Sequence, residues 1–266
     1  MNKQQLTLSL PGFLLIVASL LLLVTWLSFT PPGLLGKTDS IGYAVCHRIP
    51  ERSFFIEDRP ISLCARCSGM YLGALAALIY QLKRGKVGGM PSKKVSFILV
   101  LLLIAFGIDG INSYLHSLPT TSGLYTPQNW LRLVTGTGMG IGMAAMLYPI
   151  FNQVVWKEYS EQAVLSSWRH IGELLFIGLL IILVTLTQNP LVLYPFTILS
   201  SLTVLLMLTL IYTIIWIMLL KKENQAYNLK HIWWLLLLGF DTALLQITLM
   251  DLGRYWLTGT WGGFSL

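Results

Sequence analysis

Seven long apolar segments recur along the chain and constrain its fold more than any other feature. Each has about 20 predominantly apolar residues, the length at which a helix crosses a bilayer core of roughly 30 Å. Backbone N–H and C=O groups cannot stay unpaired in hydrocarbon, so such segments span as helices. The sequence therefore predicts an all-α membrane protein with about seven transmembrane helices, at residues 10–29, 61–82, 95–115, 130–151, 170–187, 194–220 and 232–252.

The composition supports the same class and indicates one domain. Of the 266 residues, 55% are hydrophobic and only 11% are charged, whereas about 25% are charged in an average soluble domain. No repeat of fixed period and no long polar region divides the chain, so residues 1–266 are expected to form a single polytopic membrane domain. The net charge of +7 comes from basic residues in short loops, which favours the lipid bilayer over nucleic acid as the partner.

The distribution of Lys and Arg predicts the orientation. The loops 116–129 and 188–193 contain neither residue, whereas the other connections are basic. By the positive-inside rule the N-terminus is cytoplasmic and the C-terminus is outside. The segment 10–29 is expected to be a retained helix and not a signal peptide, because no small-x-small cleavage site follows it. The basic segments on the predicted inner side are Lys3 and the loops 82–95, 152–169 and 221–231.

The first loop, residues 30–60, departs from this charge pattern because it carries arginines on the predicted outer side. One interpretation is local pairing with the acidic residues of the loop. The other is an anion-binding surface, since the Arg fork suits phosphate and carboxylate groups. A short amphipathic helix is expected near residues 40–45. The basic residues concerned are Lys37, Arg48, Arg52 and Arg59, with Arg66 just beyond, and the acidic ones are Asp39, Glu51, Glu57 and Asp58.

All three cysteines lie at the junction of this loop with the second apolar segment. Cys64 and Cys67 are three residues apart, so on a helix both thiols project from one face. Together with Cys46 and His47 they make three sulfurs and one nitrogen, a usual composition for a zinc site. Adjacent Cys46 and His47 form an awkward chelate, which leaves open whether both bind. A redox dithiol or a plain disulfide remains an alternative on an oxidising outer face.

The second apolar segment has two different faces. Tyr71 lies seven residues after Cys64 and therefore shares the cysteine face. A separate stripe of small residues at i+4 spacing predicts close packing against a neighbouring helix. This stripe consists of Ala65, Gly69, Gly73 and Ala77.

Polar side chains also line one face of each of the next two segments. An intramembrane carboxylate such as Asp109 is costly unless it is paired or functional. Arg132 is expected either to reach the outer headgroups or to pair with Asp109 or a ligand anion. With the predicted orientation all these residues fall in the outer half of the membrane, which predicts one outward-facing site. The two faces comprise Asp109, Asn112, Ser113 and His116, and Asn129, Arg132 and Gly136.

Four motifs in the first half of the chain resemble one membrane family. They are CHRIPERSF at 46–54, CARCSGMYLG at 64–73, the Asp109-Gly110 pair, and N-x-x-R-x-x-T-G at 129–136. They resemble the bacterial and archaeal family called domain of unknown function 2085, over about residues 40–150. Ser68 stands where Thr is more usual in that family. The resemblance implies a multi-pass protein of a prokaryotic plasma membrane, with additional helices over 151–266, and it implies no activity.

Three functions follow as hypotheses, and whether the protein is an enzyme and how it oligomerises stay open. The first is a zinc site of Cys64, Cys67 and Cys46 or His47, either structural or hydrolytic with Asp109 as general base. The second is a thiol–disulfide oxidoreductase that uses the Cys64/Cys67 dithiol. The third is a transporter or binding protein for an anion. The expected contacts to an anionic small molecule or lipid are Arg48, Arg52, Arg66, Asn112, Asn129 and Arg132.

Overall fold

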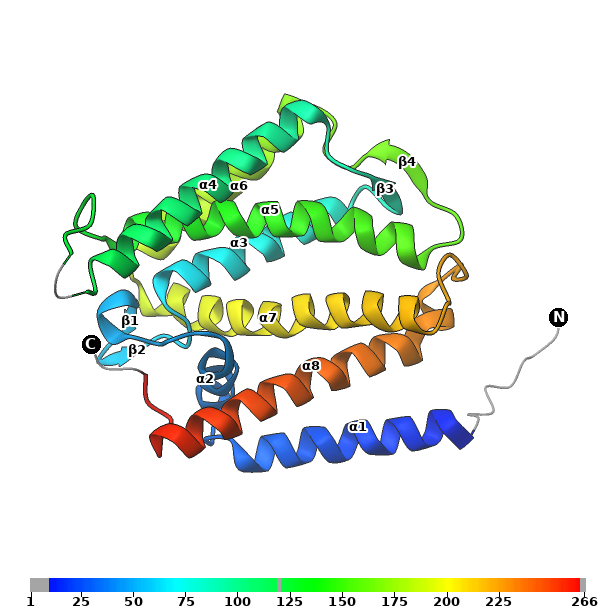
Figure 1. Cartoon of the computed structure of the whole chain (residues 1–266), viewed down its shortest axis with the longest axis horizontal. Coiled ribbons are helices and arrows are strands. Elements are labelled where there is room, and N and C mark those ends of the chain that lie inside the picture. Colours follow the sequence, from blue (N-terminus) through cyan, green and yellow to red (C-terminus); the bar gives the residue numbers. More distant parts are fainter. Residues whose placement is uncertain (1–9, 119–120, 264–266) are drawn as a thin grey trace.

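The computed structural model describes residues 10–118 and 121–263, and the protein is 72% helical. Its long helices run alongside one another, with the short helix α2 at one end of the bundle (Figure 1). The expected position of Lys3 lies outside the described residues. The helices are α1 (Leu10–Phe29), α2 (Leu34–Val45), α3 (Ala65–Leu82), α4 (Lys93–Leu115), α5 (Asn129–Val155), α6 (Trp168–Leu186), α7 (Pro190–Leu219) and α8 (Leu229–Thr258).

Within the described residues, six helices are long and apolar enough to cross a membrane: α1, α4, α5, α6, α7 and α8. The one remaining predicted span, 61–82, corresponds to α3, which starts only at Ala65 and does not meet the same criteria of length and hydropathy. The lower hydropathy of α3 fits its place in the middle of the bundle, against α5 and α7 (Figure 1). A helix enclosed by protein can carry small and polar residues that a lipid-facing helix cannot.

The core of the bundle is the packed pair α3 and α5. Glycines on both helices allow the backbones to touch: a Cβ on Gly73 would lie 2.4 Å from the Thr137 carbonyl oxygen, and one on Gly140 would lie 1.8 Å from that of Met70. Such distances exclude any side chain at these positions without separation of the helices. The packing stripe predicted on α3 is therefore confirmed.

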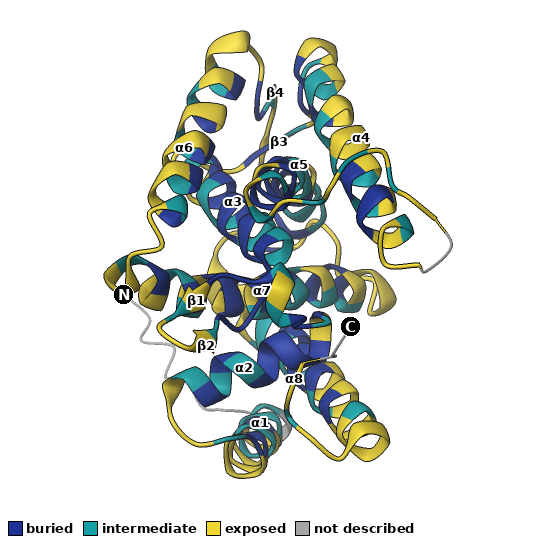
Figure 2. Cartoon of the chain, turned by 90° about the vertical axis from the view of Figure 1, so that its left-hand side faces the viewer, coloured by how far each residue is buried: buried dark blue, intermediate teal, exposed yellow. Residues whose placement is uncertain are grey.

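The outer helices present apolar side chains away from the bundle. In the most apolar 18-residue window, 67% of α5 is buried, compared with 22% of α4 and 11% of α1. Exposed residues colour the outward sides of α4, α6 and α8 in Figure 2. This pattern fits a protein that sits in a lipid bilayer, where the solvent for those faces is hydrocarbon. Helix α1 packs along α8, and Ser19 donates a hydrogen bond to Asp241 at 2.6 Å.

The two ends of the bundle differ in their connections. One end carries α2, the 3-10 turn Pro50–Arg52 and the antiparallel strands β1 (Phe55–Ile56) and β2 (Arg59–Pro60) (Figure 1). The opposite end carries the parallel strands β3 (Val87–Gly89) and β4 (Ser160–Ala163) and the α7–α8 connection. The sequence did not predict these short strands, which lie in loops. The amphipathic helix expected near 40–45 is present and begins earlier, at Leu34.

Candidate metal centre

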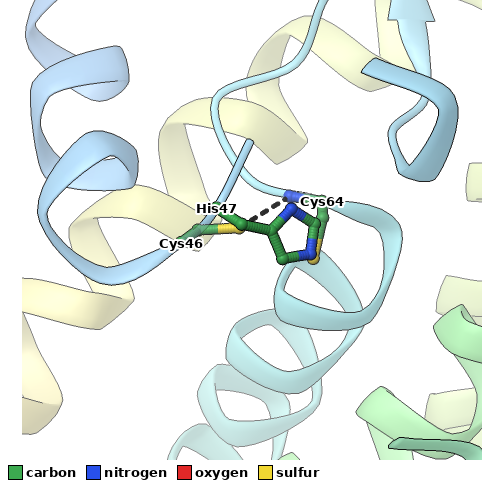
Figure 3. A group of neighbouring side chains, drawn as sticks. All are labelled: Cys46, His47 and Cys64. Atoms are coloured by element: carbon green, nitrogen blue, oxygen red, sulfur yellow. Dashed lines mark hydrogen bonds between the residues drawn. The ribbon is translucent and has the colours of Figure 1, made fainter. Parts of the chain in front are cut away.

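Three cysteines and one histidine converge where α2 ends and α3 begins. Cys46 follows the last residue of α2, Cys64 is the N-cap of α3, and Cys67 lies in its first turn. All three are free thiols. One donor atom from each of Cys46, His47 and Cys64 lies within 4.8 Å of the others (Figure 3). Cys67 is not part of this close group, but it packs against Cys46 and Cys64 in the same apolar cluster.

Local packing explains why the two segments meet. A Cβ on Gly42 would lie 2.0 Å from the Ser62 carbonyl oxygen, so α2 lies directly against the chain that leads into α3. Ser62 also donates hydrogen bonds to Thr38 and Asp39 of α2, at 2.8 and 2.7 Å. Arg48 adopts φ of 52°, an uncommon left-handed conformation that turns the chain just after the cluster. These contacts fix Cys46 beside Cys64.

The sulfur atoms are chemically unequal. The Cys46 sulfur accepts a hydrogen bond from the Cys64 amide nitrogen at 3.4 Å. The neighbouring Cys64 and Cys67 thiols lower the pKa of Cys46 well below its usual value. The same contact raises the pKa of Cys64 to about 12, because its proton is held by the Cys46 sulfur and its thiol is buried. Cys46 is therefore the first thiolate of the cluster.

His47 is held in a particular tautomer. Burial lowers its pKa, which favours the neutral imidazole that a metal needs. Its Nδ1 accepts a hydrogen bond of 2.9 Å from the Ile49 backbone N–H, so the proton of the neutral ring belongs on Nε2. Neither ring nitrogen then has a free lone pair. A metal would have to displace the Ile49 amide from Nδ1 in order to bind His47.

The cluster is enclosed by apolar side chains from four helices. Cys46 is 7% exposed and Cys64 is 3% exposed. Cys67 and Tyr71 pack into the same apolar group, so Tyr71 does share the cysteine face as predicted. Such surroundings have a low dielectric, which strengthens electrostatic interactions within the cluster. The remaining members include Trp26 of α1, Ile41 of α2, Val204 of α7, and Leu244 and Ile247 of α8.

Arg254 of α8 fastens this loop from the opposite end of the sequence. Its guanidinium donates hydrogen bonds to the carbonyl oxygens of Tyr43 and Cys46, both at 2.7 Å, and to that of His47 at 3.2 Å. It also stacks over the Tyr43 ring at 4.0 Å. The sequence did not predict this role, because 208 residues separate Arg254 from Cys46 and no local pattern links them.

A second polar cluster lies on the other side of α3, around Asp109 of α4. Arg66 donates to the Asp109 carboxylate from Nε at 3.0 Å and pairs with it through Nη2. Tyr125 donates to the other carboxylate oxygen at 2.9 Å. Asp109 is 1% exposed. Both of its oxygens are therefore occupied, and none of its hydrogen bonds within the described chain involves the cysteine cluster.

The expected single site is thus two clusters on two faces of α3. Arg66 is two residues from Cys64, which on a helix turns its side chain by about 200° away from it. Cys64 faces α2, α7 and α8, whereas the Arg66 side chain faces α4. The predicted depth in the membrane put these residues at one level, but the geometry of α3 places them on opposite sides of the helix.

The other predicted ligand-binding residues mostly hold loops. Asn112 donates to the Tyr125 carbonyl at 2.9 Å, and Asn129 donates to the carbonyls of Glu51 and Ser53. Arg48 pairs with Asp39 at 3.0 Å, as local pairing predicted, and Arg59 pairs with the same carboxylate. Arg52 and Arg132 differ from these, because they line a polar cavity.

Comparisons with known proteins place the first half of the chain. The family model described as predicted membrane protein (DUF2085) matches residues 46–146. The uncharacterized protein MJ1492 of Methanocaldococcus jannaschii is 32% identical over 117 residues, which are 43% of this chain and 69% of that protein. An uncharacterized protein of Methanothermobacter thermautotrophicus is 32% identical over 105 residues, 38% of this chain and 83% of its own length. No solved structure matches.

Proposed function

The chain belongs to the DUF2085 family of predicted membrane proteins, and we propose that Cys46, His47, Cys64 and Cys67 form a zinc site that has a structural role. The observation that supports this is the convergence of Cys46, His47 and Cys64 from two segments, with the third free thiol, Cys67, packed beside them in the first turn of α3 and no disulfide among them. Thiol groups gathered in threes are typical of a metal site, whereas a simple redox site needs only a pair.

The donor set fits zinc in composition and spacing. Zn–S bonds of about 2.3 Å in a tetrahedron place neighbouring sulfurs roughly 3.8 Å apart. The donor atoms of Cys46, His47 and Cys64 lie within 4.8 Å of one another, so small side-chain rotations bring these three to zinc distances, and Cys67 would turn toward them from the first turn of α3. The Cys64 amide near the Cys46 sulfur supplies the kind of N–H···S contact that stabilises a metal-bound thiolate. His47 is the exchangeable fourth ligand, because it must first leave the Ile49 amide.

A structural role is favoured over hydrolysis by the surroundings. The cluster is buried among apolar side chains and touches α2, α3 and, through Arg254, α8. A metal there clamps the first loop onto three helices. The hydrolytic version uses Asp109 as general base, but that carboxylate is engaged by Arg66 and Tyr125. The assignment of Asp109 to catalysis therefore has no geometric support from the cysteine side.

Metal analysis of protein purified in detergent tests the proposal directly. We expect about one equivalent of zinc in the wild type and none in Cys64→Ser or Cys67→Ser, because the loss of one thiolate removes a quarter of the ligand set. Ser68→Ala is the matched control: it changes a buried residue of the same helical turn that donates only to the Leu63 carbonyl. Wild-type protein that contains no metal and a reversible disulfide would overturn the proposal.

The thiol–disulfide oxidoreductase is the second candidate, and one observation favours it. Cys46 and His47 line an apolar groove of about 570 Å³ between α2 and α8, where a hydrophobic redox partner could approach the thiols. Such a function would interconvert a dithiol and a disulfide at these sulfurs. Thiol counting without reductant, made alongside the metal analysis, distinguishes the two candidates.

We also propose that α3 is a seventh crossing and that the cysteine end of the bundle faces out of a prokaryotic plasma membrane. The support is charge: the basic loops 83–94 and 220–231 gather at the opposite end (Figure 1). Single cysteines introduced as Ser122→Cys and Glu223→Cys test it with an impermeant thiol reagent. We expect labelling of the first in intact cells and of the second only after lysis. The reverse result would invert the topology.

A further inference from the structure

A polar cavity of about 340 Å³ lies beside the zinc-site loop, between the 3-10 turn at Pro50–Arg52 and the facing ends of α4 and α5. Arg52 and Arg132 bring two guanidinium groups to it. Hydroxyl groups complete the lining, from Ser113 and Ser117. The cavity has the size of a small-ligand pocket, which begins at about 300 Å³. It has none of the cysteine cluster in its walls.

Arg132 is the unusual member of this lining. It is 6% exposed, and the one hydrogen bond of its guanidinium within the described chain is to Asn129 Oδ1 at 2.8 Å. Its Nε is buried without a hydrogen-bond partner. Asp109, the carboxylate expected to neutralise it, is taken by Arg66. A buried guanidinium with unsatisfied donors is costly unless an anion completes its surroundings.

The charges around the cavity leave a positive excess. Arg66 and Asp109 neutralise each other. Arg52 and Arg132 then face a single acidic group, the exposed Glu51, and no ion pair joins Glu51 to either of them in the described chain. Arg52 donates to Ser117 and so keeps its guanidinium at the cavity wall. His116 also lines the cavity.

We infer that this cavity binds a phosphate group, either inorganic phosphate or the headgroup of an anionic phospholipid. Two Arg forks can donate parallel hydrogen bonds to phosphate oxygens. The Ser113 hydroxyl can supply a further donor, whereas the Ser117 hydroxyl already donates to the Ser113 carbonyl. Nη1 of Arg132 donates to Asn129, and Nη2 has no hydrogen bond within the described chain, so Nη2 is the donor that such an anion would satisfy. Of the outcomes expected for Arg132 from sequence, an ion pair with Asp109 is absent, because Asp109 pairs with Arg66, and the contact with a ligand anion or lipid headgroup is the one that this cavity favours.

Calorimetric titration of the full-length protein in detergent with inorganic phosphate tests the inference at fixed ionic strength. We expect saturable binding, weakened at least about tenfold in Arg132→Gln, because a charge-assisted hydrogen bond contributes roughly 1.5–3 kcal/mol. Arg132→Lys should fall between, since it keeps the charge and loses the fork. Arg59→Gln is the control, because it removes the same charge at the same end from a residue paired with Asp39. Arg52→Gln is the second binding variant should Arg132→Gln not fold.

A parallel titration with nanodiscs that contain phosphatidic acid identifies the source of the phosphate. Binding of this lipid that inorganic phosphate displaces assigns the headgroup, and binding of phosphate alone assigns the free anion. The inference is overturned if neither probe binds saturably, or if the folded Arg132 and Arg52 variants bind as the wild type does. Zinc content should be unchanged in these variants, so failure here is distinct from failure of the metal site.

Discussion

The two faces of α3 carry clusters that look alike in sequence and differ in chemistry. On one face Arg66 and Tyr125 both donate hydrogen bonds to the Asp109 carboxylate, so each of its oxygens has a donor. On the other face the polar groups are three cysteine thiols and one imidazole, and thiols form only weak hydrogen bonds with such neighbours. The first cluster is complete within the chain. The second has ligand capacity that the chain does not use.

This difference explains why one cluster supports a metal proposal and the other does not. A buried ion pair with its hydrogen bonds satisfied is a structural element. Removal of one partner leaves the other charge buried and unpaired, which lowers the free energy of unfolding. A set of convergent soft ligands gains its stability only when a cation binds. The two faces should therefore respond in opposite ways to mutation and to chelation.

The largest effect is expected from removing one partner of the buried ion pair between Arg66 and Asp109. Asp109→Leu leaves the Arg66 guanidinium without its counter-ion while its side chain is only 17% exposed, and we expect a loss of about 3–5 kcal/mol of stability. The double variant Arg66→Met with Asp109→Leu should recover most of that loss, because an apolar pair of similar volume carries no charge to desolvate. Thermal unfolding in detergent measures both. Equal destabilisation by the single and double variants would contradict the ion-pair interpretation.

Chelation should affect the opposite face and spare this one. Removal of zinc from the wild type is expected to destabilise it by about 3–4 kcal/mol when free metal had been at 100 to 1,000 times its dissociation constant. Protease should then cut within residues 47–63, the loop that the metal holds. The folded double variant of the ion pair should show the same sensitivity to chelator as the wild type. A wild-type protein whose loop is equally resistant with and without chelator would remove the clamp from the proposal.

Sequence reasoning succeeded where the determinant was local. The i, i+3 spacing of Cys64 and Cys67 placed them on one face with Tyr71, and the i+4 stripe with Gly69 and Gly73 predicted the tight contact with α5. Apolar run lengths located the six helices that meet the measure for a membrane span. Each of these depends on helical periodicity, which the sequence displays directly.

It did not identify pairings that depend on tertiary structure. The partner of Asp109 is Arg66, not Arg132, because α3 turns Arg66 toward α4. Arg254 caps the cysteine loop from the end of α8, and a one-dimensional pattern carries no sign of it. The separation of one expected site into two clusters has the same origin, since residues at one depth can lie on opposite sides of a helix.

The pH dependence of zinc binding is the next difference expected between the two faces. Zinc binding must displace the Cys64 proton, whose pKa is about 12 in the metal-free protein, whereas Cys46 has a lowered pKa and gives up its proton more easily. Zinc affinity should therefore rise by at least about tenfold for each unit between roughly pH 6 and 8, with proton release on binding. Competition with a chromophoric chelator in buffers of different pH measures it. An affinity that is flat over this range would show that thiol protons are not displaced.

The smallest effect is expected from removing one hydrogen bond to Asp109 while its ion pair with Arg66 is kept. Tyr125→Phe removes one hydrogen bond to Asp109 Oδ1 and keeps the ion pair with Arg66. Because Tyr125 is half-exposed, water can replace its hydroxyl, and the loss should be about 1 kcal/mol. The same variant should leave zinc content and its pH dependence unchanged, since none of its hydrogen bonds reaches the sulfurs. A loss of zinc in Tyr125→Phe would mean that the two faces of α3 are coupled, and the comparison between them would have to be replaced by one shared site.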